Sequence, residues 1–192
     1  MASKMAIVVG HKASSPGASI AAPLNCSEYE YNKDLALYVY RDARNSSLDA
    51  QIFTRDGTSI KGVYKKVKEW FGEDEGVCAV ELHCNSAVSD EAYGTEILID
   101  AVPSESQALA ECMETEIYPI FGRQDKGKRG VKLLHDGDRG HYALEQTDKP
   151  SVILEPAFGN NPKEAALLAK NKMAYSKAIV NAVLLFYNSK LN

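Results

Sequence analysis

The chain has 192 residues, 45% of them hydrophobic and 25% charged, a composition typical of a globular protein with one sizeable core. The formal net charge of −4 argues against nucleic-acid binding as the main task, and no apolar run approaches the length that inserts into and spans a membrane. The N-terminus lacks a basic segment followed by an apolar signal core, so we expect synthesis in the cytoplasm without a signal peptide. Because no repeat or linker interrupts the sequence, we expect residues 1–192 to form a single domain.

The first predicted strand, Met5 to Gly10, leads directly to His11. A loop rich in Ala, Ser, Pro and Gly follows over residues 12–25, and loops of this length inside compact domains are often functional. A helix is then predicted from Ser27 as N-cap to about Ala43, because Ser27 and Glu30 have the spacing of a capping box.

The inward face of this helix is predicted to carry Leu35 and Val39, and helical steps backwards from them reach Asn32 and Glu28. Glu30 points elsewhere and already has a capping role. Glu28 is therefore the better candidate for a metal ligand, although a solvated glutamate that favours the helix dipole is the alternative for Glu28 taken alone.

Further strands and helices alternate along the rest of the chain. The apolar runs predict strands over residues 50–54, 78–85, 94–99 and 151–154, a short apolar piece over residues 131–134, and helices over residues 60–71, 103–120 and 162–187. Asn161, Pro162 and Glu164 resemble a second capping box with proline at N1. This alternation predicts an α/β fold, a three-layer sandwich whose mainly parallel sheet is flanked by helices.

Three of the predicted strands end in a residue that can bind metal or transfer protons. The strands end at His11, His83 and Glu155, and open α/β sheets place their ligands at such carboxyl ends. His11, Glu28 and His83 would give a zinc ion three protein ligands and leave one position for water. Glu155, held extended by Pro156, would take the proton from that water. A hydrogen-bonded structural histidine is the alternative for each histidine taken singly.

Four segments carry a resemblance to a known family. Val8 to His11, Glu28 with Asn32, Glu81 to Ser86, and Ile153 to Glu164 resemble the zinc-dependent N-acetylmuramoyl-L-alanine amidases in order, spacing and position. Residues 27–33 and 81–83 are most similar to the phage endolysins of that family.

The resemblance implies a sheet of about six strands flanked by helices. It also implies one Zn²⁺ held by His11, Glu28 and His83, with Glu155 as the catalytic glutamate. The substrate would be peptidoglycan, cut at the amide between the lactyl group of muramic acid and L-alanine of the stem peptide. We further expect a monomer, no separate cell-wall-binding module, and action on the wall after release at host lysis.

The chain departs from the family pattern near two ligands. Lys12, Ala13 and Ser14 follow His11 where the family usually has two glycines, and Cys84 and Ser86 replace smaller residues around His83. These changes concern the substrate groove more than the ligands.

Other interpretations of the sequence remain open. A zinc amidohydrolase or peptidase that acts on another amide is one alternative, and a catalytically silent wall-binding module is another. His135 and His141 flank a loop, for which substrate contact is one interpretation and a plain surface loop is the simpler one. Glu81 has no assigned role. The cysteines form no C-x-x-C pair and are expected to be free thiols that do not touch the metal. Cys84 follows His83 and should point to the opposite face of the strand, whereas Cys26 lies in a loop near a candidate ligand and is less easily excluded.

Overall fold

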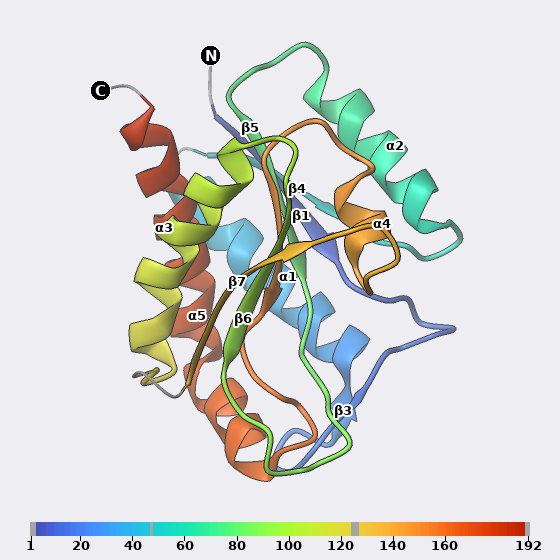
Figure 1. Ribbon diagram of the computed structural model, residues 1–192, viewed down its shortest axis with the longest axis vertical. Helices are drawn as coiled ribbons and strands as arrows, with labels where there is room; N and C mark the ends of the chain where they lie inside the picture. Colours follow the sequence, from blue (N-terminus) through green and yellow to red (C-terminus); the bar gives the residue numbers. More distant parts are fainter. Residues whose placement is uncertain (1–2, 47, 124–126, 191–192) are drawn as a thin grey trace.

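The computed structural model describes residues 3–46, 48–123 and 127–190, and its centre is a six-stranded sheet (Figure 1). Its strand order is β4-β1-β5-β8-β6-β7. The strands are β1 (Lys4–Val9), β4 (Asp49–Phe53), β5 (Val77–Leu82), β6 (Thr95–Asp100), β7 (Lys128–Leu134) and β8 (Ser151–Glu155). The predicted α/β fold with a mostly parallel sheet is confirmed.

The sheet is mixed, because β6 pairs antiparallel with β8 while β7 runs parallel to β6. The connection from β5 to β6 contains no helix, so the chain turns back without the crossover that keeps strands parallel. The reversed pair was not predicted from the sequence, since apolar runs carry no information on strand direction. The short apolar piece predicted over residues 131–134 belongs to β7.

Helices cover both faces of the sheet (Figure 1). One face carries α1 (Glu28–Asn45), α3 (Glu105–Ile120) and α5 (Pro162–Ser189), and the other carries α2 (Ile60–Phe71) and the short α4 (His141–Leu144). No helix in the described ranges is both long and apolar enough to cross a membrane.

The apolar runs of the central strands follow from this double cover. In β1, Met5, Ile7 and Val9 pack towards α1, α3 and α5, whereas Ala6 and Val8 pack towards α2. A strand that is buried on both faces needs apolar residues at every position, unlike the alternating pattern of a half-exposed strand.

Helix α1 begins as the sequence predicts. The Ser27 side chain accepts a hydrogen bond from the Glu30 backbone N–H, and the Glu30 carboxylate accepts one from the Ser27 backbone. Glu28 and Asn32 are buried on the inward face with Leu35, whereas Glu30 is exposed. The helical phase therefore separates the two glutamates correctly.

The predicted second capping box forms only in part. Asn161 caps α5 by accepting from the Lys163 N–H, but the Glu164 carboxylate turns into the protein. It forms a buried ion pair with Arg123, with nitrogen–oxygen distances of 2.7 and 2.8 Å. A tertiary partner has thus replaced the local one, because a buried guanidinium would otherwise lack a counter-charge.

The predicted loop over residues 12–25 is more ordered than its composition suggests. It contains β2 (Ser19–Ile20), which pairs antiparallel with β3 (Cys26–Ser27) just before α1. The Ala21 N–H also donates to the Gly159 carbonyl, so this segment is attached to the loop that follows β8. The loop therefore holds a fixed path beside the sheet edge where β1, β5 and β8 end.

Candidate metal centre at the sheet edge

The register of three neighbouring strands brings the candidate residues together. Val9 of β1 pairs with Leu82 of β5, which pairs with Leu154 of β8. The next residues continue this alignment, because the His83 N–H donates to the Leu154 carbonyl at 3.0 Å. His83 and Glu155 are thus adjacent, and His11 lies one residue beyond the same edge.

Glu28 reaches this edge from the first turn of α1. Its Oε1 accepts a hydrogen bond from the Cys84 N–H at 3.0 Å, and its Oε2 accepts one from the Ala18 N–H at 3.1 Å. These two backbone donors fix the carboxylate, whose exposed fraction is 2%. A carboxylate held in this way keeps its remaining lone pairs for a further partner.

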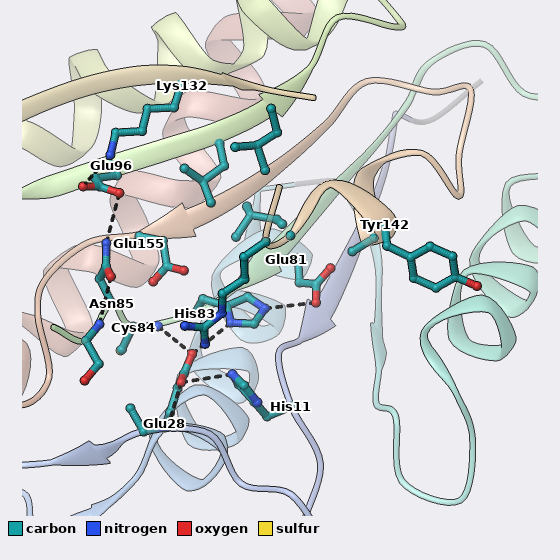
Figure 2. Close-up of a pocket in the computed structure, with 18 of the residues that line it drawn as sticks. His11, Glu28, Glu81, His83, Cys84, Asn85, Glu96, Lys132, Tyr142 and Glu155 are labelled. Atoms are coloured by element: carbon teal, nitrogen blue, oxygen red, sulfur yellow. Dashed lines mark hydrogen bonds and ion pairs between the residues drawn. The ribbon is translucent and has the colours of Figure 1, made fainter. Parts of the chain in front are cut away.

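Both histidines turn a ring nitrogen towards Glu28 (Figure 2). His83 Nδ1 lies 2.9 Å from Glu28 Oε1, and His11 Nε2 lies 3.1 Å from Glu28 Oε2. One ligand atom from each of the three residues lies within 4.8 Å of the others, and they form the one such group found in the described ranges. The structure therefore brings together the three candidate ligands that the sequence singles out.

The donor set fits a zinc ion. His11 Nε2 is buried and, despite its closeness to Glu28, has no aligned hydrogen-bond partner among the described residues. A buried nitrogen of this kind is costly unless something binds it. Two imidazoles and a carboxylate are also a ligand combination that catalytic zinc sites use.

The electrostatics of the group reflect its close packing. Burial alone would raise the pKa of Glu28, but the imidazole nitrogens of His11 and His83 outweigh burial and hold that pKa well below its usual range. Burial alone would lower the pKa of His83, but its hydrogen bonds to Glu28 and Glu81 raise that pKa to about 10. Two carboxylates, Glu28 and Glu81, therefore favour positive charge on the imidazole between them, and a divalent cation would supply positive charge at the same edge.

Two glycines that the sequence analysis did not single out shape the site. A Cβ on Gly10 would lie 2.5 Å from the Leu82 carbonyl oxygen and 2.6 Å from the His83 ring. A Cβ on Gly17 would lie 2.5 Å from Glu28 Oε2, and Gly17 has a φ of +79°. The Gly10-His11 sequence was the available signal, since glycine beside a candidate ligand indicates close approach of the backbone.

His11 itself has a φ of +63°, a left-handed conformation that residues with a Cβ seldom adopt. The Arg55 side chain donates to the His11 carbonyl at 3.2 Å and helps to hold this conformation. Such backbone outliers cluster at functional sites, where the surrounding structure fixes them.

Glu155 lies beside the three ligands on the same side of the sheet (Figure 2). Its Oε2 is buried and has no hydrogen-bond partner among the described residues. Burial raises the pKa of Glu155 to about 8, with His83 opposing this and Glu28 adding to it. A carboxyl group in this state can both accept and release a proton near neutral pH.

A cavity of about 360 Å³ opens over this edge and contains His11, Glu28, His83 and Glu155. Its lining also includes two cations, Lys132 and Arg139, beside apolar residues such as Leu98, and Tyr142 stands at one side of it with about half of its surface exposed (Figure 2). Lys132 Nζ lies 2.8 Å from the buried Glu96 carboxylate, to which the Asn85 side chain donates at 3.0 Å. Sequence reasoning did not identify these lining residues, because β6 and β7 reach the cavity only through the mixed strand order.

The remaining candidates lie outside the metal group. Neither His135 nor His141 is among the described residues that line the cavity. His141 Nε2 lies 3.4 Å from Asp100, and His135 is exposed, as a surface loop predicts. All four cysteines are free thiols, and Cys84 packs on the side of the sheet opposite His83, as predicted.

The fold and site together define an α/β protein with a His-Glu-His group and a neighbouring carboxyl group at one sheet edge. A family model described as N-acetylmuramoyl-L-alanine amidase matches residues 5–184. The chain therefore belongs to the N-acetylmuramoyl-L-alanine amidase family, whose members depend on zinc.

Individual relatives are distant in sequence. The germination-specific N-acetylmuramoyl-L-alanine amidase of Bacillus subtilis (strain 168) is 24% identical over 113 residues, which make up 58% of this chain but only 45% of that protein. The aligned part thus spans about half the length of this curated relative.

Solved structures share the fold over nearly the whole chain. The N-acetylmuramoyl-L-alanine amidase of Clostridium difficile 630 superposes with a TM-score of 0.81 at 20% identity, covering 98% of both chains. The catalytic domain of CwlV from Bacillus (Paenibacillus) polymyxa var. colistinus gives 0.78 at 21% identity, covering 97% of this chain and 98% of that one. The catalytic domain of the CD27L endolysin, which targets Clostridia difficile, gives 0.72 at 24% identity, covering 95% and 97%.

Proposed function

We propose that this protein hydrolyses peptidoglycan at the amide between the lactyl group of muramic acid and L-alanine of the stem peptide. The observation that carries the proposal is the convergence of His11, Glu28 and His83 beside Glu155 in one cavity, in a chain of the amidase family.

His11 Nε2, Glu28 and His83 Nδ1 are the atoms and groups that would hold one Zn²⁺. When bound, the zinc would polarise the scissile carbonyl and activate water. Glu155 would accept a proton from the attacking water and pass it to the leaving nitrogen of L-alanine. Glu155 lines the cavity, and its Oε2 has no hydrogen-bond partner among the described residues, which supports this role.

The raised pKa of Glu155 suits such a proton shuttle. A proton-transfer group works best when its pKa lies near the working pH, and burial moves the pKa of Glu155 in that direction. A bound cation would pull the same pKa down again, because positive charge favours the carboxylate. The two opposing influences allow one group to act first as base and then as acid.

Mass spectrometry of digested peptidoglycan tests the reaction directly. New N-terminal L-alanine together with intact muramic acid lactyl groups is the expected result. Release of other fragments would instead identify an amidohydrolase or peptidase of different specificity. Wall binding without any cleavage would identify a silent docking module.

Glu155→Gln tests the assigned proton shuttle. We expect this variant to keep its zinc and its fold and to lose roughly two to four orders of magnitude in turnover, the usual contribution of positioned acid-base catalysis. Glu30→Gln is the matched control, because it makes the same chemical change at an exposed capping residue. A Glu155→Gln variant that digests walls as fast as the parent would remove Glu155 from the mechanism.

A narrower proposal concerns the biological setting. We propose that the chain acts as one monomeric catalytic domain of a phage endolysin, made in the cytoplasm and reaching the wall at host lysis. The similarity of residues 27–33 and 81–83 to endolysins, together with the shared fold of the CD27L domain, supports this setting. Lysis of intact cells by protein added from outside, compared with protein produced inside them, distinguishes it from a bacterial wall-remodelling enzyme.

A further inference from the structure

We propose that Glu81, itself held by Tyr64, is a positioning residue that fixes the His83 ring with Nδ1 facing the metal. This inference rests on the metal site proposed above, and it assigns a role to a carboxylate that the reaction itself does not use.

The two nitrogens of His83 face different carboxylates (Figure 2). Nδ1 lies 2.9 Å from Glu28 Oε1, and Nε2 lies 3.1 Å from Glu81 Oε1. Nδ1 is the nitrogen turned towards Glu28, a second candidate ligand, whereas Nε2 faces a residue outside the metal group, so Nδ1 is the atom that would bind the metal.

The chemistry of Glu81 determines which nitrogen carries the proton. Both ring nitrogens face carboxylates, which only accept hydrogen bonds, so without a metal each nitrogen has an acceptor for a hydrogen. When a metal takes Nδ1, the hydrogen must lie on Nε2, and Glu81 is the acceptor that holds it there. A neutral imidazole has a single N–H, which leaves the Nδ1 lone pair free for a metal. Outer partners of this kind orient ligating histidines and strengthen them as ligands.

Glu81 is itself fixed from the other side. Its Oε2 accepts a hydrogen bond from the Tyr64 hydroxyl at 2.8 Å, and both side chains are almost fully buried between β5 and α2. Each carboxylate oxygen thus has one partner, and the arrangement runs from α2 through Glu81 to His83.

The position of Glu81 argues against a role in folding alone. Its neighbours on the same face of β5, Val77 and Ala79, are apolar and pack against α2. An apolar residue at position 81 would continue that layer, whereas a carboxylate there is costly to bury. Contact with a metal ligand gives a reason for a charged residue at this point.

Zinc affinity separates the positioning role from a structural one. We would measure the zinc Kd of the purified protein by competition with a chromophoric chelator, and in parallel the urea unfolding of chelator-treated protein. Glu81→Met, which removes the acceptor, should weaken zinc binding about 10–100-fold. Glu81→Gln, which retains an acceptor oxygen, should weaken it less, and Glu30→Gln should leave it unchanged.

Two further measurements keep the test decisive if Glu81→Met folds poorly. Tyr64→Phe keeps Glu81 but removes the hydroxyl that donates to its Oε2. This variant should weaken zinc binding by a smaller factor than Glu81→Met. In the zinc-loaded parent, ¹⁵N NMR of the His83 ring should show a protonated Nε2 and a metal-bound Nδ1.

The outcomes are distinct for the two proposals. A parent protein that binds no zinc would overturn the metal site and this inference together. Zinc binding with an unchanged Kd in Glu81→Met, or a protonated Nδ1 in the zinc-loaded parent, would overturn only the role of Glu81. A loss of unfolding free energy without any loss of zinc affinity would make Glu81 purely structural and overturn the proposal.

Discussion

Replacement of Glu155 by glutamine should change how the stability of the metal-stripped protein depends on pH. Burial raises the pKa of Glu155 from 4.5 to about 8, so the folded protein binds this proton more tightly than the unfolded chain. Between these two values, ionisation of Glu155 costs folding free energy, and unfolding becomes easier as the pH rises. The cost is absent below about pH 4.5 and fully present above about pH 8.

The size of the effect follows from the same two pKa values. At about 1.4 kcal/mol for each pH unit between them, the buried charge costs up to about 5 kcal/mol above pH 8. Glutamine has nearly the same shape but no charge. The unfolding free energy of the variant, relative to that of the parent, should therefore rise by several kcal/mol between pH 5 and pH 9. The amide can add a difference that is the same at every pH, and this does not affect the rise.

Urea denaturation at a series of pH values, with chelator present throughout, measures this difference. Glu30→Gln serves as control, because the pKa of the exposed Glu30 is lowered by its hydrogen bonds to Ser27 and it titrates below the range of interest. A difference between Glu155→Gln and the parent that stays constant from pH 5 to pH 9 would refute the buried, unpartnered carboxyl group described above.

Other predictions concern the ligands, the glycine beside them and the thiols. Glu28→Ala should abolish zinc binding as measured by metal analysis, whereas Glu30→Ala should keep the zinc and lose only about 1 kcal/mol of unfolding free energy through its cap; the opposite pattern would exchange the two roles. Gly10→Ala should displace the His83 ring and weaken zinc binding at least tenfold, while Gly76→Ala, whose added Cβ meets nothing closer than 3.8 Å, should bind zinc like the parent. Thiol titration should count four free thiols after denaturation, with slow reaction in the native state of the buried pair, because burial raises the pKa of Cys78 to about 12 and that of Cys84 well above its usual value. Fewer than four would reveal a disulfide.

The local features of this protein are encoded in short stretches of its sequence. Apolar runs predict the strands that lead to His11, His83 and Glu155, and a 3.6-residue period places Glu28 inward and Glu30 outward. These inferences succeeded because strand composition, helical phase and N-capping depend on residues only a few positions apart. The amino-acid sequence alone was therefore enough to single out the candidate ligands.

How these pieces meet depends on the tertiary structure. The order β4-β1-β5-β8 places the three strand ends side by side, and the antiparallel β6 with its neighbour β7 brings Glu96 and Lys132 to the same cavity. Tyr64 and its partner Glu81 are 17 residues apart, and Arg123 and its partner Glu164 are 41 residues apart. No local pattern encodes such pairs, because they depend on which elements become neighbours when the chain covers both faces of the sheet. For the same reason, Glu164 has the spacing of a capping residue yet forms a buried ion pair.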